Sequence, residues 1–145
     1  MQVSGVRVEL RPLAANDFPG ILESMPPMHE GAEAVTILRA DNPRPIGLIQ
    51  YLPSHRNDGW LTIRFIELAP QFRGWGYGSE AVQLLEAEAI LSGITQGLQA
   101  LVPTHNGLAL YFWLRMGYRP AAPGDAFWRS EGDDATMAMT RGTPG

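Results

Sequence analysis

The sequence contains neither cysteine nor lysine, and each absence excludes a class of chemistry. Without cysteine there is no disulfide framework, thiol nucleophile or thiolate metal site, and nothing marks an oxidising compartment, so we expect a cytoplasmic protein. All eleven bases are arginine, so a Schiff base and a Walker A loop are excluded as well. No apolar run approaches the roughly 18 residues of a membrane span, and the N-terminus lacks a signal-peptide pattern. We therefore expect a soluble, unprocessed chain.

Basic charge is also scarce. Fifteen acids against eleven bases give a net charge of −4, and no basic cluster is present, so duplex nucleic acid is not expected as a partner. The 145 residues are 45% hydrophobic and 18% charged, which is typical of an ordinary globular protein. We expect one domain over residues 1–145, with no metal site and no membrane association.

The pattern of apolar residues predicts a mixed α and β domain with helices on both sides of a sheet. Residues 60–70 carry apolar side chains at both parities, which is typical of a central strand covered on both faces. The turn-forming segment 41–45 predicts a hairpin between its flanking strands. Strands are predicted at 6–13 (an edge strand), 34–40, 46–52, 60–70, 98–102 and 135–140, and helices at 16–25, 79–92 and 106–116.

The helix at 79–92 shows the clearest amphipathic pattern. Its predicted apolar stripe contains Val82, Leu85 and Ala89. Its predicted polar stripe contains Ser79, Gln83 and Glu86. Gly93 is expected to end this helix.

Three glycines, Gly74, Gly76 and Gly78, separate the predicted central strand from this helix. The first N–H groups of a helix have no partners within the helix and lie at the positive end of its dipole, and a residue without Cβ lets a phosphate approach the backbone. A tight turn would explain a pair of glycines, but three at such a junction favour an anion site. A dinucleotide loop would require GxGxxG after the first strand, whereas here the third glycine comes one residue early, in mid-chain.

The segment resembles the acetyl-CoA loop of the GNAT N-acetyltransferases, whose pattern is (Q/R)xxGx(G/A). Gln71, Arg73, Gly74, Trp75 and Gly76 meet it, and Arg73, Gly76 and Gly78 meet it in a second frame.

Three further features carry this resemblance. Residues 68–70 (LAP) stand where that family ends its fourth strand, and 76–85 (GYGSEAVQLL) is similar to the subgroup that acetylates N-terminal amines of ribosomal proteins. Asn106, Gly117 and Tyr118 match a second family motif. The resemblance covers roughly residues 6–120 and is specific from 66 to 118.

The resemblance implies a GNAT fold, with a central mixed sheet of six to seven strands. Its fourth and fifth strands, 60–69 and 98–102, would separate after Leu68, and the freed backbone of Leu68 and Ala69 would pair with the pantetheine of acetyl-CoA. The diphosphate would lie on the N–H groups of the loop, with Asn106 and Trp113 beside the pantetheine arm. The implied loop residues are Arg73, Gly74, Trp75, Gly76, Tyr77, Gly78 and Ser79.

Acetyl transfer to an amine requires a neutral amine, a polarised carbonyl and a leaving thiolate. Glu67, at the end of the fourth strand, is the candidate base, although a carboxylate paired with Arg64 or simply solvated explains it equally well. His105 is a weaker candidate base, and His29 and Glu30 fall in a loop that borders the acceptor site in this family. The backbone N–H of Leu68 is the candidate that polarises the carbonyl.

The sequence departs from the family at the general acid. Seven residues after Asn106, where the family places a tyrosine, stands Trp113, which we interpret as a core or CoA-packing aromatic. Tyr111 lies two residues earlier, about 200° round the helix, and cannot take its place.

The sequence therefore predicts an acetyl-CoA-dependent N-acetyltransferase that transfers the acetyl group directly to a primary amine, on a protein N-terminus or a small molecule. A non-catalytic acyl-CoA-binding or sensor module on the same fold is the alternative, and an unrelated nucleotide-binding α/β domain is a third. A homodimer is left open.

Overall fold

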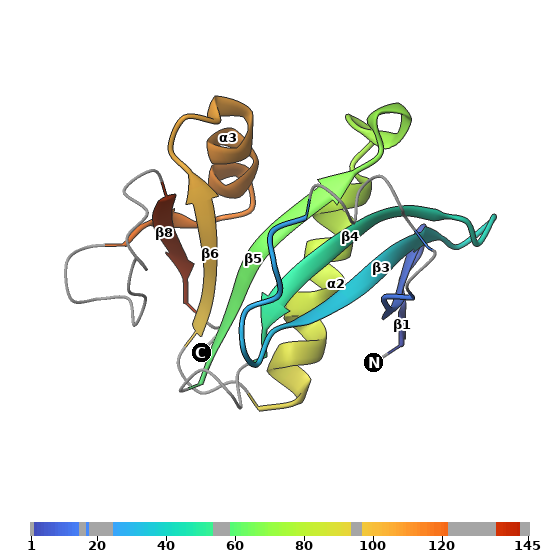
Figure 1. The fold of residues 1–145 in the computed structure, drawn as a ribbon, viewed down its shortest axis with the longest axis horizontal. Coiled ribbons are helices and arrows are strands. Elements are labelled where there is room, and N and C mark those ends of the chain that lie inside the picture. The colour runs from blue at the N-terminus through green and yellow to red at the C-terminus, as the bar shows by residue number, and fades with distance from the viewer. Residues whose placement is uncertain are drawn as a thin grey trace.

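The computed structural model describes residues 2–14, 17, 25–53, 59–93, 97–121 and 136–142. In these ranges eight strands form one sheet in the order β1-β2-β3-β4-β5-β6-β8-β7 (Figure 1). All neighbouring strands are antiparallel except β5 and β6, which are parallel. The strands are β1 (Val3–Ser4), β2 (Val8–Pro12), β3 (Glu33–Arg39), β4 (Pro45–Leu52), β5 (Trp60–Leu68), β6 (Gly97–Pro103), β7 (Arg119–Pro120) and β8 (Thr136–Arg141).

The sheet is mixed, as the sequence predicted, and the hairpin of β3 and β4 is confirmed. Two strands of only two residues, β1 and β7, extend it beyond the six or seven strands expected. The strand predicted at 6–13 is confirmed as β2, but it is not the edge strand, because β1 folds back on β2 and takes the edge itself. The sequence missed β1 because two residues are too few to show an alternating pattern.

Two α-helices are described, α2 (Tyr77–Leu91) and α3 (Gly107–Arg115), with a 3₁₀ turn η2 (Pro70–Phe72) before the first. Both were predicted, and each is followed by a glycine with positive φ, Gly93 or Gly117. The helix predicted at 16–25 lies outside the described residues apart from Asp17 and Met25. Within the described ranges, no helix is long and apolar enough to cross a membrane.

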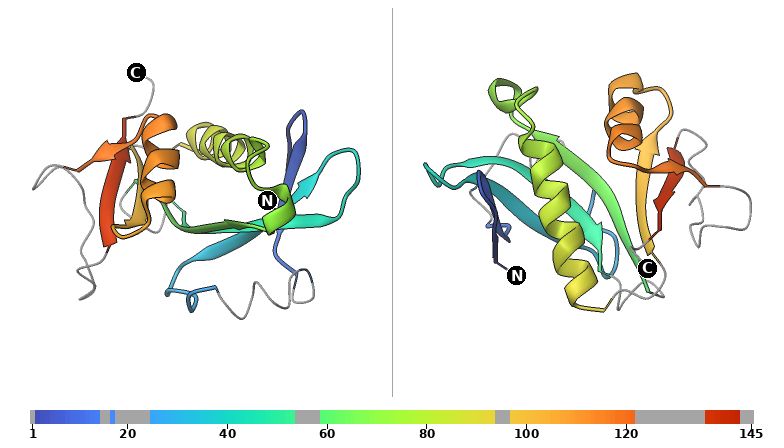
Figure 2. Two further views of the ribbon diagram at one scale, coloured as in Figure 1. Left: turned by 90° about the horizontal axis from the view of Figure 1, so that it is seen from above. Right: turned by 180° about the vertical axis from the view of Figure 1, so that it is seen from behind.

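Helices α2 and α3 lie next to each other on one face of the sheet (Figure 2). The main core lies beneath them, where Val82 and Leu85 of α2 pack with Ile49 and Ile63 of the sheet. Residues 25–32 cross the opposite face, where the Gln50 side-chain amide donates to the Pro26 carbonyl at 3.1 Å (Figure 1). At one end of this sheet, β5 and β6 separate (Figure 1).

Strands β5 and β6 pair over a short stretch, from Trp60 opposite Gly97 to Ile63 opposite Ala100. Immediately afterwards the register of β5 with β4 shifts and skips Arg64, which marks a β-bulge. A bulge bends its strand, so β5 turns away from β6, and the two diverge in Figure 1. The separation therefore begins after Ile63, earlier than the point after Leu68 that the sequence predicted.

Candidate active site

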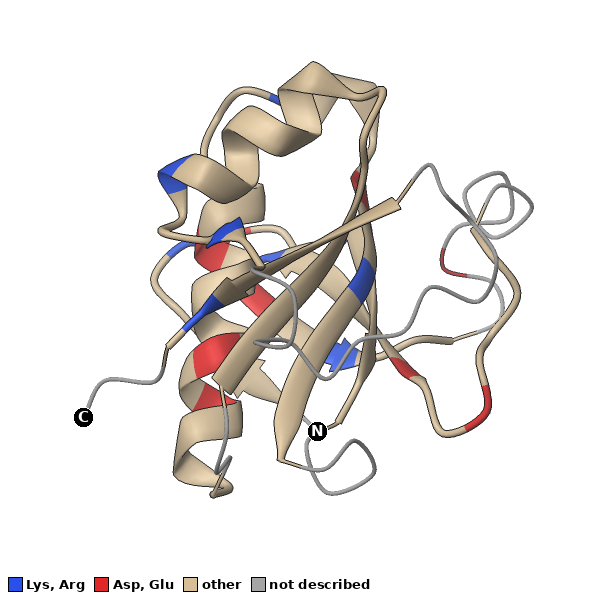
Figure 3. Cartoon of the chain, turned by 90° about the vertical axis from the view of Figure 1, so that its left-hand side faces the viewer, with Lys and Arg blue, Asp and Glu red and all other residues tan. Residues whose placement is uncertain are grey.

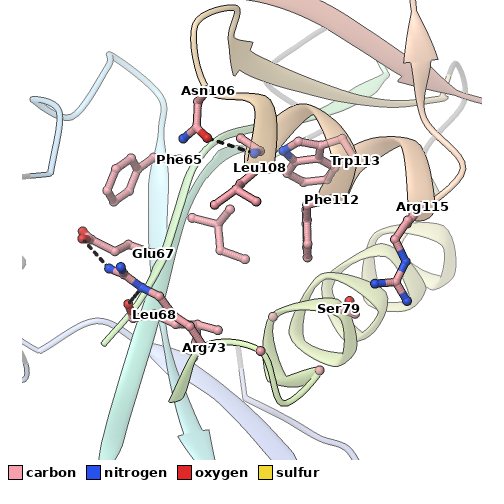
Figure 4. Close-up of a pocket in the computed structure, with 15 residues that line it drawn as sticks. Phe65, Glu67, Leu68, Arg73, Ser79, Asn106, Leu108, Phe112, Trp113 and Arg115 are labelled. Atoms are coloured by element: carbon pink, nitrogen blue, oxygen red, sulfur yellow. Dashed lines mark hydrogen bonds and ion pairs between the residues drawn. The ribbon is translucent and has the colours of Figure 1, made fainter. Parts of the chain in front are cut away.

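A cleft of about 670 Å³ opens where β5 and β6 separate (Figure 4). Its walls are the end of β5, the glycine loop with the first turn of α2, and one side of α3. The lining residues are Phe65, Ile66, Glu67, Leu68, Arg73, Gly74, Gly76, Gly78, Ser79, Asn106, Leu108, Ala109, Phe112, Trp113 and Arg115.

The glycine loop has the geometry of an anion site. Gly74 and Gly76 have φ values of +82° and +84°, a region that side chains with Cβ rarely adopt, so both glycines are required for the path of the backbone. Gly76 is the N-cap of α2 and no side chain caps the helix. The N–H groups of Tyr77, Gly78 and Ser79, in the first turn of α2, are therefore available to a ligand.

Gly78 has a different role from the two loop glycines. A Cβ placed there would lie 3.4 Å from Leu68 Cδ1 and 3.6 Å from Phe112 Cε1. Its small size lets the start of α2 pack closely between β5 and α3. The three glycines predicted as one motif thus divide into two that shape the loop and one that sets helix packing.

The backbone of β5 is turned toward the gap. Ala69 N–H donates to the Ile46 carbonyl at 2.8 Å, and Leu68 stands opposite Gly47 in the register with β4. An antiparallel ladder alternates between residue pairs that exchange hydrogen bonds and pairs whose polar groups face away from each other. The N–H and C=O groups of Leu68 and of Ile66 therefore face the gap between β5 and β6. The expectation for Ala69 is wrong, because its N–H is bonded to β4 and its carbonyl accepts from the Phe72 N–H at 2.9 Å.

One of these groups already has a partner. Arg73 Nε donates to the Leu68 carbonyl at 2.9 Å, so the expectation that the freed backbone would be without partners is corrected at this atom. The guanidinium reaches this carbonyl because η2 brings Arg73 back beside the end of β5. A ligand that pairs with the Leu68 carbonyl shares this acceptor with Arg73 or displaces it.

Glu67 projects from β5 on the side away from α3 (Figure 4). Its Oε1 lies 3.6 Å from Arg73 Nη2, and its side chain is 28% exposed. Arg64, the alternative partner considered from the sequence, donates to Gln50 Oε1 at 2.8 Å. Glu67 thus stands at the gap beside the Arg73 guanidinium.

Asn106 is the N-cap of α3. Its Oδ1 accepts from the Ala109 N–H at 3.1 Å, which fixes the side chain at the mouth of the cleft. This capping is a structural reason for the asparagine that the motif alone did not reveal. Of the other candidates, His105 is exposed in the turn before Asn106, and His29 Nδ1 lies 2.8 Å from the Glu30 carbonyl in the segment on the opposite face.

Trp113 lines the cleft and is also part of the core. It is 3% exposed and packs edge-on against Tyr118 at 4.8 Å and Phe112 at 5.1 Å between ring centroids. Tyr111 is 60% exposed, lies under the Arg115 guanidinium at 5.6 Å, and is not among the described residues that line the cleft. Neither residue presents a phenol to the gap.

Sequence analysis missed four residues on the α3 wall, Leu108, Ala109, Phe112 and Arg115. Leu108, Phe112 and Arg115 line the cleft and follow the spacing of one helical face. Counting from the N-cap at Asn106 would have placed them together. Arg115 adds a second arginine, after Arg73, to the lining of a site proposed for an anion.

Gly47 on β4 was missed as well. A Cβ there would lie 2.5 Å from the Glu67 carbonyl oxygen and 2.6 Å from Leu68 Cδ2. Glycine is thus needed for β4 to approach the end of β5 that carries Glu67 and Leu68. Its place inside a predicted strand, where glycine is unfavourable, was the signal.

The predicted polar stripe of α2 is wrong at Glu86, which is 4% exposed. Its carboxylate accepts from the Tyr118 hydroxyl at 2.6 Å and from Arg141 Nη1 at 3.1 Å. Burial raises the pKa of Glu86 above its ordinary value, and these two donors offset part of the rise. Helical periodicity could not show that a residue after α3 and one on β8 supply donors at this position.

Taken together, the sheet with one separated parallel pair, the glycine loop before a helix and the cleft between them define an acyl-CoA-binding α+β domain. The acetyltransferase (GNAT) family model matches residues 9–118, and the chain belongs to this family. It is therefore an acyltransferase that takes the acetyl group from acetyl-CoA, and the residues lining the cleft suit such a ligand.

Solved structures with the same fold have low sequence identity. The Arabidopsis thaliana protein NAA60, solved with acetyl-CoA, has a TM-score of 0.68 at 12% identity, covering 95% of this chain and 99% of that one. A candidate ribosomal-protein-serine acetyltransferase from Vibrio cholerae has a TM-score of 0.73 at 13% identity, covering 99% and 98%. The spermidine/spermine N-acetyltransferase SpeG from the same species has a TM-score of 0.66 at 12% identity, covering 93% and 92%. No curated protein matches the sequence.

Proposed function

We propose that the chain acetylates a primary amine by direct transfer from acetyl-CoA, and that an N-terminal α-amine is the preferred acceptor. The observation that carries this proposal is the place of Glu67, at the gap between β5 and β6 and on the side of β5 away from α3. An amine that enters from that side meets a thioester held in the cleft. The chain has no cysteine to carry a covalent acyl intermediate, which supports direct transfer.

The preference for an α-amine follows because the described lining of the cleft offers few groups that could remove a proton from the acceptor amine. An α-amine with a pKa near 8 is roughly one tenth neutral at pH 7, whereas an alkyl amine with a pKa near 10 is about a thousandth neutral. Glu67 is the described carboxylate that lines the cleft, and Arg73 lies near it. The pair is long and partly exposed, so its attraction is weak.

Bound acetyl-CoA supplies the acetyl group as a thioester. The N–H groups from Gly74 to Ser79 hold its diphosphate, and Arg115 adds a cation from the α3 wall. Leu68 and Asn106 position the pantetheine, and Trp113 closes the bottom of the cleft. The N–H of Leu68 donates to the thioester carbonyl oxygen and so stabilises the charge that develops there.

The test is Glu67→Gln, which keeps the size of the side chain and removes its basic oxygen. We expect kcat/KM to fall by about 10²-fold, a typical size for lost general-base catalysis, with the acidic limb of the pH profile flattened. The loss should be smaller for an α-amine peptide than for a side-chain amine. Glu9→Gln is the matched control, since Glu9 is on β2, three strands away in the sheet. A change below threefold for Glu67→Gln would contradict the role of this base.

A binding module without turnover is favoured by one feature, the tryptophan at position 113 in place of a phenol donor. Incubation with acetyl-CoA and a panel of peptide and polyamine acceptors separates the two functions, because a sensor would bind CoA and release no free thiol. The cytoplasmic location, the single domain over 1–145 and a homodimer stay predictions.

A further inference from the structure

We propose that Arg7, which lies outside the cleft, is a positioning residue that holds the glycine loop ready for the diphosphate of acetyl-CoA. The inference rests on the proposed function only in taking this loop as the CoA site. Arg7 stands in the turn between β1 and β2, far in sequence from the loop, and is not among the described residues that line the cleft.

The guanidinium of Arg7 contacts the loop from behind at two points. Nη1 donates to the Trp75 carbonyl at 3.0 Å, and Cζ lies over the Tyr77 ring at 4.9 Å. Nη2 also occupies the space beside Gly76, 3.0 Å from where a Cβ on that residue would stand. One side chain thus contacts the residues on both sides of Gly76, at the junction of loop and helix.

Arg7 is itself fixed by Glu80 in the first turns of α2. Arg7 N and Nε donate to the two carboxylate oxygens of Glu80 at 2.7 and 3.0 Å, and Val8 N donates at 3.0 Å. The Arg7 carbonyl accepts from the Ala40 N–H at 2.8 Å, which joins the turn to the end of β3. Its backbone and side chain are therefore both held before any ligand arrives.

The bond to the Trp75 carbonyl has a direct geometric consequence. The C=O of Trp75 and the N–H of Gly76 belong to one planar trans peptide and point in opposite directions. Holding the carbonyl toward Arg7 turns the Gly76 N–H away from Arg7, on a residue that lines the cleft. Because Gly74 and Gly76 allow many backbone conformations, an external hold is what selects the one that binds.

A loop fixed in its binding conformation costs less conformational entropy when the ligand binds. Replacing Arg7 should therefore weaken binding of the nucleotide part of acetyl-CoA and leave the chemical step unchanged. Arginine suits this task because its planar fork can hold a carboxylate and a carbonyl together, which a lysine ammonium cannot do in the same geometry.

The experiment compares Arg7→Ala, Arg7→Lys and Arg39→Ala with the unaltered chain. Arg39 is the matched control, since its Cζ lies over the same Tyr77 ring at 5.9 Å while its guanidinium bonds Asp41. CoA affinity is measured by calorimetry, and kcat and KM are measured with acetyl-CoA and with acetyl-pantetheine, which lacks the diphosphate. Thermal unfolding checks that each variant folds.

We expect Arg7→Ala to weaken CoA binding and raise the KM for acetyl-CoA by about tenfold, the loss of one oriented charge-assisted hydrogen bond. The value of kcat, and kcat/KM for acetyl-pantetheine, should stay within threefold. Arg7→Lys should not restore affinity, and Arg39→Ala should behave as the unaltered chain does.

Three outcomes overturn the proposal: unchanged CoA affinity in Arg7→Ala, equal losses for acetyl-CoA and acetyl-pantetheine, or full rescue by lysine, which would show that charge without geometry suffices. Failure of the proposed function looks different. The unaltered chain would then bind CoA and acetylate no amine, and the comparison of CoA affinities would still decide the role of Arg7.

Discussion

At the scale of single residues, we expect the two loop glycines, Gly74 and Gly76, to determine whether a phosphate can approach the backbone. Gly74 has no atom within 4 Å of a Cβ position, while Gly76 has the Arg7 guanidinium at 3.0 Å. The loop thus has open space on one side and a cation behind it. A side chain at position 76 would be drawn toward Arg7 and alter the junction where α2 begins.

We expect Gly76→Asp to reduce CoA affinity by at least a hundredfold, because the new carboxylate repels the diphosphate and pairs with Arg7. Gly93→Asp is the control, since Gly93 has φ +91° and open space but lies after the far end of α2. Both variants carry a similar backbone strain of about 1–3 kcal/mol, which circular dichroism and thermal unfolding would verify. Calorimetry with CoA that shows no difference between them would exclude the loop as the phosphate site.

The phenol of Tyr111 is predicted to have no role in catalysis. The thiol of CoA, with a pKa near 8.5, leaves as thiolate at pH 7, so its protonation contributes at most about 2 kcal/mol, or some 30-fold. Tyr111→Phe should change kcat by less than threefold, because Tyr111 is exposed and lies outside the cleft lining. A loss of a hundredfold in kcat with acetyl-CoA affinity kept would instead identify Tyr111 as the general acid.

At the scale of elements, Glu86 joins α2 to the end of α3 and to β8. Tyr118 and Arg141 both donate to its carboxylate, and Tyr118 also packs against Trp113 at the bottom of the cleft. Burial raises the pKa of the Tyr118 phenol, so the hydroxyl keeps its proton and remains a donor. This buried network sets the spacing between the two helices that form the cleft walls.

Removing the donor with Tyr118→Phe should lower the free energy of unfolding by about 1–3 kcal/mol at neutral pH, since the buried carboxylate loses a hydrogen bond. Burial raises the pKa of Glu86 in the folded state, so the folded chain binds the proton more tightly than the unfolded one. Stability due to this group therefore rises as the pH falls through its raised pKa. Denaturant unfolding at several pH values should show the gap between variant and unaltered chain narrowing in acid, and a constant gap would contradict this assignment.

At the scale of the whole molecule, the anionic ligand meets a chain of net charge −4. In the view of Figure 3, arginines and acids are spread over the described strands and helices and form no basic face. We therefore expect the attraction of CoA to depend on local groups, the N–H groups of the loop with Arg73 and Arg115, and less on the overall field.

CoA should stabilise the folded chain by mass action, by about 2.7 kcal/mol at a concentration of 100 times its Kd. A thermal-shift titration should show Tm rising with CoA and little change with NAD or ATP at equal concentration. Arg115→Gln should reduce the shift and its salt dependence. An equal shift with all three nucleotides would support the unrelated nucleotide-binding domain that the sequence left open.

Much of the local structure could be predicted because it depends on neighbouring residues. The strands and helices around the site follow from alternating or helical patterns, and Asn106 and Gly117 mark the ends of α3. The positive φ of Gly74 and Gly76 was foreseeable from three glycines between a strand and a helix. These features are determined by the sequence because backbone sterics and local hydrogen bonds act within a few residues.

The tertiary structure decided what depends on residues far apart in the chain. It placed the bulge at Arg64 that starts the separation of β5 and β6, turned Arg73 onto the Leu68 carbonyl, and buried Glu86 between two donors from later elements. It also brought Arg7 behind the glycine loop, where its side chain bonds the carbonyl of Trp75, 68 residues away in the sequence. No periodicity encodes such contacts, because they arise only when sheet register and helix packing bring separate segments together.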